Sequence, residues 1–119
     1  MKMNEELAQS FGLEWIAAWN SRDLPRIMSH YSEHIHFQSP YIIRLGMNEQ
    51  GIIDDKPTLE AYFKKALDVY QDLHFELHEV LTGAGSLVLF YTSVNGRKAA
   101  EFMQLDESGK INLVKAHYN

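Results

Sequence analysis

The sequence has no cysteine and only three prolines in 119 residues. Without cysteine the chain can form no disulfide, no thiolate metal site and no cysteine nucleophile. No apolar run approaches the roughly 20 residues that a membrane-spanning helix needs. The first residues become acidic at Glu5 and Glu6, where a secretory signal needs an apolar stretch. We therefore expect a reducing, cytoplasmic setting and no membrane partner.

Basic residues are also scarce, with 11 Lys and Arg against 16 Asp and Glu and a formal net charge of −5. Binding to nucleic acid requires clustered Lys and Arg, whereas here they are scattered among acidic residues. We expect no nucleic-acid partner. Apolar residues make up 45% of the chain, which is enough for a core at this length. One domain spanning residues 1–119 is expected.

Three segments of the first 70 residues show apolar residues at helical spacing. Asn4 is a predicted N-cap for the first, Asp23 caps a shorter second helix, and Pro57 opens the third, which runs to Tyr70. The predicted apolar stripe of the first helix is Leu7, Phe11, Trp15, Ala18 and Trp19. The predicted buried face of the second is Leu24, Ile27, Met28 and Tyr31.

From His34 the apolar period changes to two, and Pro40 ends this strand. A second short strand is predicted at Tyr41–Leu45, and residues 46–55 are expected to form an exposed loop. After Gln71, alternating segments separated by turn signals, including Asn95-Gly96, predict four hairpin-connected strands. The order α-α-β-(β)-α-β-β-β-β indicates an α+β fold with helices on one face of an antiparallel sheet.

The stretch from Trp15 to Asn20, the segment Phe37–Pro40 and the later run from residue 96 to 102 resemble nuclear transport factor 2-like domains. That superfamily includes ketosteroid isomerases and SnoaL-like polyketide cyclases. The resemblance covers nearly the whole chain, apart from a longer loop around residues 46–55. It implies a cystatin-like cone, in which a curved antiparallel sheet wraps three helices of the N-terminal half around a pocket. It indicates function poorly, because the superfamily contains enzymes, binders and adaptors.

Three positions matter for the isomerase branch of this resemblance. Its base position corresponds to Ser39, its phenol position to Trp15, and its protonated-acid position to Glu101. A serine hydroxyl cannot take a carbon-bound proton at neutral pH without an activating base. An indole N–H is also a weaker donor than a phenol. We therefore expect no ketosteroid isomerase activity.

Glu101 is the candidate catalytic residue. Strand alternation places it on one face with Ala99, Met103 and Leu105. A carboxyl among apolar neighbours acquires a raised pKa and can act as a general acid or base. SnoaL-like cyclases resemble this arrangement, with one sheet carboxylate carrying the acid–base chemistry. The alternative is a rim glutamate paired with Arg97 or Lys115.

The predicted ligand pocket surrounds Glu101 and suits a small, mostly hydrophobic molecule with one polar group. Its expected lining is Trp15, Trp19, Ser39, Tyr62, Met103 and Tyr118. An aromatic stripe at helical spacing is usually core packing, so Trp15 and Trp19 are expected in the core first and can line the pocket as well. Tyr118 could instead fray at the end of the last strand.

No cofactor is expected, because no phosphate-binding loop or redox motif occurs. His34 and His36 share a strand face, as do His74 and His78. A zinc site needs three or four convergent ligands, so we expect no metal at either pair.

Two functions remain open. The first is a ligand-binding domain, with isomerase or cyclase chemistry through Glu101. The second is a non-catalytic adaptor that forms a homodimer through the outer face of the sheet. The residues expected on that face are His36, Gln38, His74, Glu76, His78, Phe102 and Gln104. An open cavity beside Glu101 favours the first, and a core closed by Trp15 and Trp19 favours the second.

Overall fold

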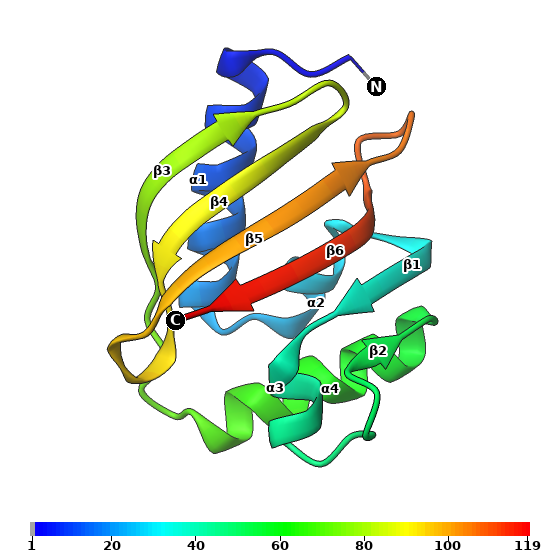
Figure 1. Ribbon diagram of the computed structural model, residues 1–119, viewed down its shortest axis with the longest axis vertical. Helices are drawn as coiled ribbons and strands as arrows, with labels where there is room; N and C mark the ends of the chain where they lie inside the picture. The colour runs from blue at the N-terminus through cyan, green and yellow to red at the C-terminus, as the bar shows by residue number, and fades with distance from the viewer. Residues whose placement is uncertain (1) are drawn as a thin grey trace.

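The computed structural model describes residues 2–119 and places the helices on one face of a six-stranded sheet (Figure 1). The helices are α1 (Glu5–Ser21), α2 (Leu24–Met28), α3 (Pro40–Arg44) and α4 (Lys56–Val69), with a 3-10 turn η1 (Val94–Gly96). The strands are β1 (Tyr31–Gln38), β2 (Ile52–Ile53), β3 (Glu76–Thr82), β4 (Ser86–Thr92), β5 (Lys98–Leu105) and β6 (Ile111–Tyr118). No helix within residues 2–119 has the length and apolar character to cross a membrane.

Polar caps start the three predicted helices. The Asn4 side chain accepts a hydrogen bond from the backbone N–H of Leu7 at 2.9 Å. Asp23 caps α2, and Asp55 caps α4 through a 2.8 Å bond from the N–H of Thr58. Each cap satisfies a backbone N–H that has no partner inside the helix.

The predicted strand at Tyr41–Leu45 is wrong, because this segment lies in and just after helix α3. The Ser39 hydroxyl accepts from the N–H of Tyr41 at 3.2 Å, and Pro40 occupies the first helical turn. Serine followed by proline is a helix-start signal, and here it outweighs the short apolar run. The predicted loop at residues 46–55 is not fully exposed, since it contains β2, which pairs with Phe37 and Gln38 of β1.

The strand order is β2-β1-β6-β5-β4-β3. All neighbouring pairs are antiparallel except β1 and β6, which run parallel and make the sheet mixed rather than wholly antiparallel. Hairpin turns set the direction of β4, β5 and β6 relative to their predecessors. The β4–β5 turn has positive φ at Asn95 (59°) and Gly96 (69°), as the turn signal predicts. No such turn joins β1 to β6, so turn chemistry could not show their relative direction.

Helix α1 lies behind β3 and β4 in Figure 1. Its buried residues are Ala8, Gly12, Trp15, Ala18 and Trp19. Leu7, predicted in this stripe, is 41% exposed. A Cβ added to Gly12 would lie 2.9 Å from Val80 Cγ2 and 3.0 Å from Leu89 Cδ2, so the helix sits unusually close to the sheet. Tyr31, predicted on α2, is instead the buried first residue of β1.

Candidate functional site

Strand β5 carries Glu101 into the interior, between β4 and β6. Glu101 pairs with Leu89 on one side and Ala116 on the other, and only 3% of its surface is exposed. Ala99, Met103 and Leu105 are buried on the same face, which confirms the predicted alternation. Arg97 does not pair with this carboxyl, because it donates hydrogen bonds to the carbonyl of Asn119 and to the Tyr41 hydroxyl. Glu101 is therefore an interior residue and not the rim glutamate of the alternative reading.

Among residues 2–119 the Glu101 carboxyl has one neutral hydrogen-bond donor and no cation beside it. The Tyr91 hydroxyl donates to Oε1 at 2.6 Å. Burial raises the pKa of Glu101 to about 7, and the hydrogen bond from Tyr91 opposes this rise only in part. Near neutral pH the carboxyl therefore exists in both protonation states. It can take or give a proton without a large energetic penalty.

Phenol groups surround this carboxyl. Burial raises the pKa of Tyr91 and of Tyr118 well above the usual range, and the charge of Glu101 raises both further. Burial also raises the pKa of Tyr62, while the nearby Ser39 hydroxyl opposes the rise. At neutral pH these hydroxyls keep their protons and remain hydrogen-bond donors.

Trp15 and Trp19 belong to the aromatic core and also reach the site. Trp15 stacks on Phe75 at a centroid distance of 5.8 Å, and its Nε1 donates to the Tyr31 hydroxyl at 3.1 Å. Trp19 Nε1 is buried and makes no hydrogen bond of good geometry within residues 2–119, although Tyr31 is its polar neighbour. The Tyr31 hydroxyl therefore lies beside both indole N–H groups, away from the cavity lining.

A cavity of about 50 Å³ lies against Glu101. Ten of its sixteen lining residues are aromatic, and Glu101 is the only acidic or basic side chain among those described. A buried water needs roughly 10–15 Å³, so this space holds only a few. Pockets for drug-sized ligands are nearer 300–1,000 Å³. The core is thus neither sealed nor widely open, and it admits only the end of a ligand or a very small one.

A surface groove of about 410 Å³ continues from this cavity. It lies between residues 69–74, which follow α4, and residues 92–96 of the β4–β5 turn; Figure 1 shows these segments at the same end of the molecule as the C-terminus. Tyr70, Leu73, Ser93 and Val94 line both the groove and the cavity. The site therefore has a narrow inner chamber and a wide outer one.

Five of the predicted site residues line the inner cavity, namely Glu101, Trp15, Trp19, Tyr62 and Tyr118. The other two do not. The Ser39 hydroxyl caps α3, and the fully buried Met103 packs between its strand partners Leu87 and Val114.

Sequence reasoning missed Tyr91, which makes the one hydrogen bond to Glu101. A signal for it existed. The Asn95-Gly96 turn sets the β4–β5 register, in which Tyr91 pairs with Ala99 and lies diagonally across from Glu101. The alternation Leu87, Leu89, Tyr91 then places all three side chains inward.

The histidines lie away from this cavity. His36 forms an ion pair with Asp54, and His78 contacts the Thr92 hydroxyl at 2.6 Å. Within residues 2–119 no group of three or more His, Asp or Glu side chains could hold a metal ion.

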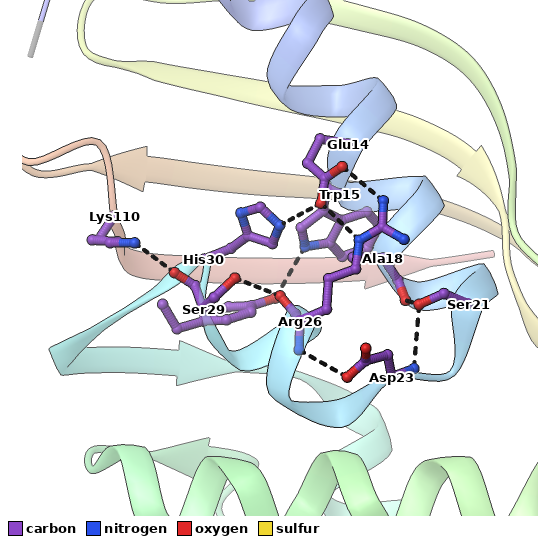
Figure 2. Close-up of polar contacts among 10 residues, drawn as sticks. Glu14, Trp15, Ala18, Ser21, Asp23, Arg26, Ser29, His30 and Lys110 are labelled. Atoms are coloured by element: carbon purple, nitrogen blue, oxygen red, sulfur yellow. Dashed lines mark hydrogen bonds and ion pairs between the residues drawn. The ribbon is translucent and has the colours of Figure 1, made fainter.

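A separate charged cluster links α1 to α2 and the start of β1 (Figure 2). Arg26 donates to Glu14 through Nη2 at 2.8 Å and Nε at 3.1 Å, and His30 Nε2 lies 3.1 Å from Glu14 Oε2. The hydrogen bond from Arg26 is the main reason that the pKa of Glu14 falls to about 2, with partial burial opposing it. No cavity adjoins this cluster among the four described.

Comparison with known proteins gives a consistent picture. A SnoaL-like domain model matches residues 13–112. A SnoaL-like protein of unknown function from Burkholderia thailandensis is 34% identical, with a TM-score of 0.94 over 100% of this chain and 99% of that one. A SnoaL-like protein from Agrobacterium tumefaciens, proposed to be an isomerase, is 13% identical with a TM-score of 0.75 over 94% and 97% of the two chains. The protein TerC, co-crystallised with polyporic acid, is 14% identical with a TM-score of 0.73 over 90% and 87%. No curated protein matches the chain.

Proposed function

The chain belongs to the SnoaL-like domain family of the nuclear transport factor 2-like superfamily, and we propose that it binds a small, mostly hydrophobic molecule with one carbonyl-type polar group against Glu101. The Glu101 carboxyl then acts as general acid or base in an isomerisation or cyclisation. The observation that carries this proposal is a buried carboxyl with a pKa near 7 facing an aromatic cavity.

The proposed chemistry moves a proton next to a carbonyl. The ionised Glu101 takes the proton from the carbon beside the carbonyl, the electron pair of the broken C–H bond forms a C=C bond, and the π pair of the C=O bond moves to the oxygen. Neutral donors that line the cavity, the phenol hydroxyls of Tyr62 and Tyr118, stabilise that oxygen. Where the substrate carries a C=C bond next to that carbon, Glu101 returns the proton to the far end of the conjugated enolate and the C=C bond shifts, so this isomerisation needs no co-reactant. Ser39 does not replace Glu101 as the base, because a serine hydroxyl without an activating base does not take a carbon-bound proton; this hydroxyl caps α3 and lies beside Tyr62 and Tyr118.

Two features of the cavity support a small ligand. The inner chamber is about 50 Å³, so only the reactive end of a molecule fits beside Glu101. Its mostly aromatic walls leave room for only a few waters, and a ligand that displaces them strengthens each electrostatic interaction at the carboxyl. The TerC complex with polyporic acid is consistent with ligand binding in this fold, but it names no ligand for this chain.

The test is the pair Glu101→Gln and Glu79→Gln. Glu79 is an exposed glutamate on β3, so it controls for loss of one acidic charge. A thermal-shift screen of small ketones, aromatic acids and terpenoids selects binders, and NMR follows exchange of ketone α-protons with deuterium. We expect wild type and Glu79→Gln to exchange at similar rates, and Glu101→Gln to lose exchange while it keeps its fold. Exchange at the wild-type rate in folded Glu101→Gln would disprove the catalytic role.

We also propose a homodimer through the outer sheet face, as an alternative or additional role. Phe90 and Phe102 are only partly covered there, and Leu81 at its edge is 51% exposed. His36, Gln38 and Gln104 add polar groups, a mixture typical of modest interfaces. Light scattering tests this with Phe102→Lys, which should dissociate the dimer, and Leu13→Lys on exposed α1 as the control. A monomer at high protein concentration would contradict it.

The cytoplasmic setting remains a prediction.

A further inference from the structure

A second polar side chain, Arg97, lies just before β5 in an extended conformation (φ −77°, ψ 140°). Arg97, Ala99 and Glu101 alternate, so their side chains lie on the same face of the strand. Four residues of strand span roughly 13 Å between the Cα atoms of Arg97 and Glu101. Ala99 lies between them and contributes only a methyl group. The buried acid and the guanidinium are thus separated by about the length of a small ligand.

Two tyrosines hold this guanidinium, and a third packs against one of them. Arg97 Cζ lies 5.7 Å from the Tyr41 ring centroid and 5.8 Å from that of Tyr118, and the two rings are 4.6 Å apart. Arg97 Nη1 also donates to the Tyr41 hydroxyl at 3.3 Å. Tyr70 packs against Tyr41 at 6.0 Å. All three tyrosines line the inner cavity, and Arg97 follows Gly96, which lines the outer groove.

A second arginine faces the same ring. Arg44, at the end of α3, has its Cζ 5.1 Å from the Tyr41 centroid, and no carboxylate pairs with it among residues 2–119. Both guanidinium charges act on Tyr70, where they oppose the rise in pKa caused by burial. Two cations without a carboxylate side-chain partner therefore flank the entrance, in a chain whose net charge is −5.

We propose that Arg97, assisted by Arg44, binds the anionic end of an elongated ligand whose carbonyl end lies against Glu101. This inference rests on the proposed function of Glu101, and it narrows the ligand class to hydrophobic keto acids. A guanidinium binds a carboxylate with two parallel hydrogen bonds. Arg97 already donates from Nε and Nη2 to the Asn119 carbonyl and from Nη1 to the Tyr41 hydroxyl, which leaves one N–H on each terminal nitrogen for a ligand. The carboxylate would remain at the wet rim, where its desolvation cost is small.

The experiment uses acetylvalerate, a methyl ketone joined by methylenes to a carboxylate, and its uncharged methyl ester. Dissociation constants are measured by calorimetry, and deuterium exchange beside the ketone is followed in parallel. We expect wild type to bind the acid about tenfold more tightly than the ester, a ratio that falls as salt is raised. Arg97→Gln should bring the ratio close to one without weakening the ester, and Arg44→Gln should reduce it less. Equal binding of acid and ester to wild type would overturn the inference.

Three further variants make the outcome specific. Lys98→Gln removes a neighbouring charge on the opposite face of β5 and should leave the ratio unchanged; an equal loss there would overturn the role of Arg97. Arg97→Lys keeps the charge but loses the paired N–H groups, so it should lower the acid–ester ratio only in part. If Arg97→Gln unfolds, an acid–ester ratio unchanged in both Arg97→Lys and Arg44→Gln would overturn the inference. Glu101→Gln should abolish exchange but keep the acid–ester ratio. If exchange depends on Glu101 but wild type shows no preference for the acid, only the inference about Arg97 is overturned. If wild type shows an Arg97-dependent preference but no exchange, only the catalytic proposal is overturned.

Discussion

Glu101 and Glu14 are both glutamates of one small protein, and their environments drive their pKa values in opposite directions. Glu101 lies in the aromatic cavity with one phenol donor, and its pKa is about 7. Glu14 lies at the surface between Arg26 and His30, and its pKa is about 2. Trp15, next in sequence to Glu14, faces the cavity, so two adjacent residues of α1 belong to the two regions.

The difference shows what makes a carboxyl useful for proton transfer. At Glu14 the guanidinium of Arg26 compensates the charge, so the group stays ionised and holds α1 to α2 (Figure 2). At Glu101 no cation compensates the charge, so burial makes ionisation costly near neutral pH. A strongly paired acid is a structural element, whereas an unpaired buried acid can exchange its proton.

The largest expected effect is on the free energy of unfolding, and it tests whether aromatic packing stabilises the region around the Glu101 cavity. Trp15→Ala removes the stack on Phe75 and the hydrogen bond to Tyr31, and we expect it to lower the free energy of unfolding by about 3–5 kcal/mol. Trp15→Phe keeps a ring and should cost clearly less. Urea denaturation measures both. If the two variants lost the same free energy of unfolding, the packing of a ring at position 15 would not stabilise the core around the cavity.

The next effect is the pH dependence that Glu101 imposes on stability. Between pH 4.5 and about 7, the folded protein holds a proton on Glu101 that the unfolded chain has released. Stability contributed by this group therefore falls as pH rises through that window, by about 3 kcal/mol. Glu101→Gln should remove this component, so the difference between its urea curves and those of wild type isolates it. A constant difference across this range would refute the raised pKa.

A smaller effect comes from the donor to that carboxyl. Tyr91→Phe removes the hydrogen bond that lowers the pKa of Glu101, so the pKa should rise further. The variant should also lose about 1 kcal/mol of stability, the usual value of a buried hydrogen bond. Carbon-13 NMR of the labelled carboxyl measures the pKa, and Tyr70→Phe at the cavity mouth is the control. An unchanged midpoint in Tyr91→Phe would show that the hydrogen bond is not maintained in solution.

The smallest effect on stability is expected at the charged cluster of Glu14, Arg26 and His30. The lowered pKa of Glu14 means that its contribution is complete above pH 4.5 and is lost as pH falls towards 2. The side chain is 43% exposed, so solvent screening limits this contribution to about 1 kcal/mol or less. Glu14→Gln should lose that acid-dependent part while leaving the behaviour between pH 4.5 and 7 unchanged. A change in the neutral range would mean that the two regions are coupled.

Local rules predicted much of the fold. Asn4 and Asp23 begin helices where polar caps were expected, and the Asn95-Gly96 turn aligns β4 with β5. They failed where two local signals competed, as at Tyr41–Leu45, where the helix start at Ser39 and Pro40 prevailed over an apolar run. They also failed where only distant contacts decide, as in the parallel pairing of β1 with β6.

The same division applies to the site. Strand alternation by itself determined that Glu101 faces inward among apolar residues, because successive side chains of a strand point to opposite faces. Only the tertiary structure decided what meets it there. Tyr91 comes from the neighbouring strand, Trp19 from α1, and the arginines at the mouth from α3 and the residue before β5. Periodicity is a property of one segment, whereas the distances that set a pKa or form a cavity depend on how several segments pack.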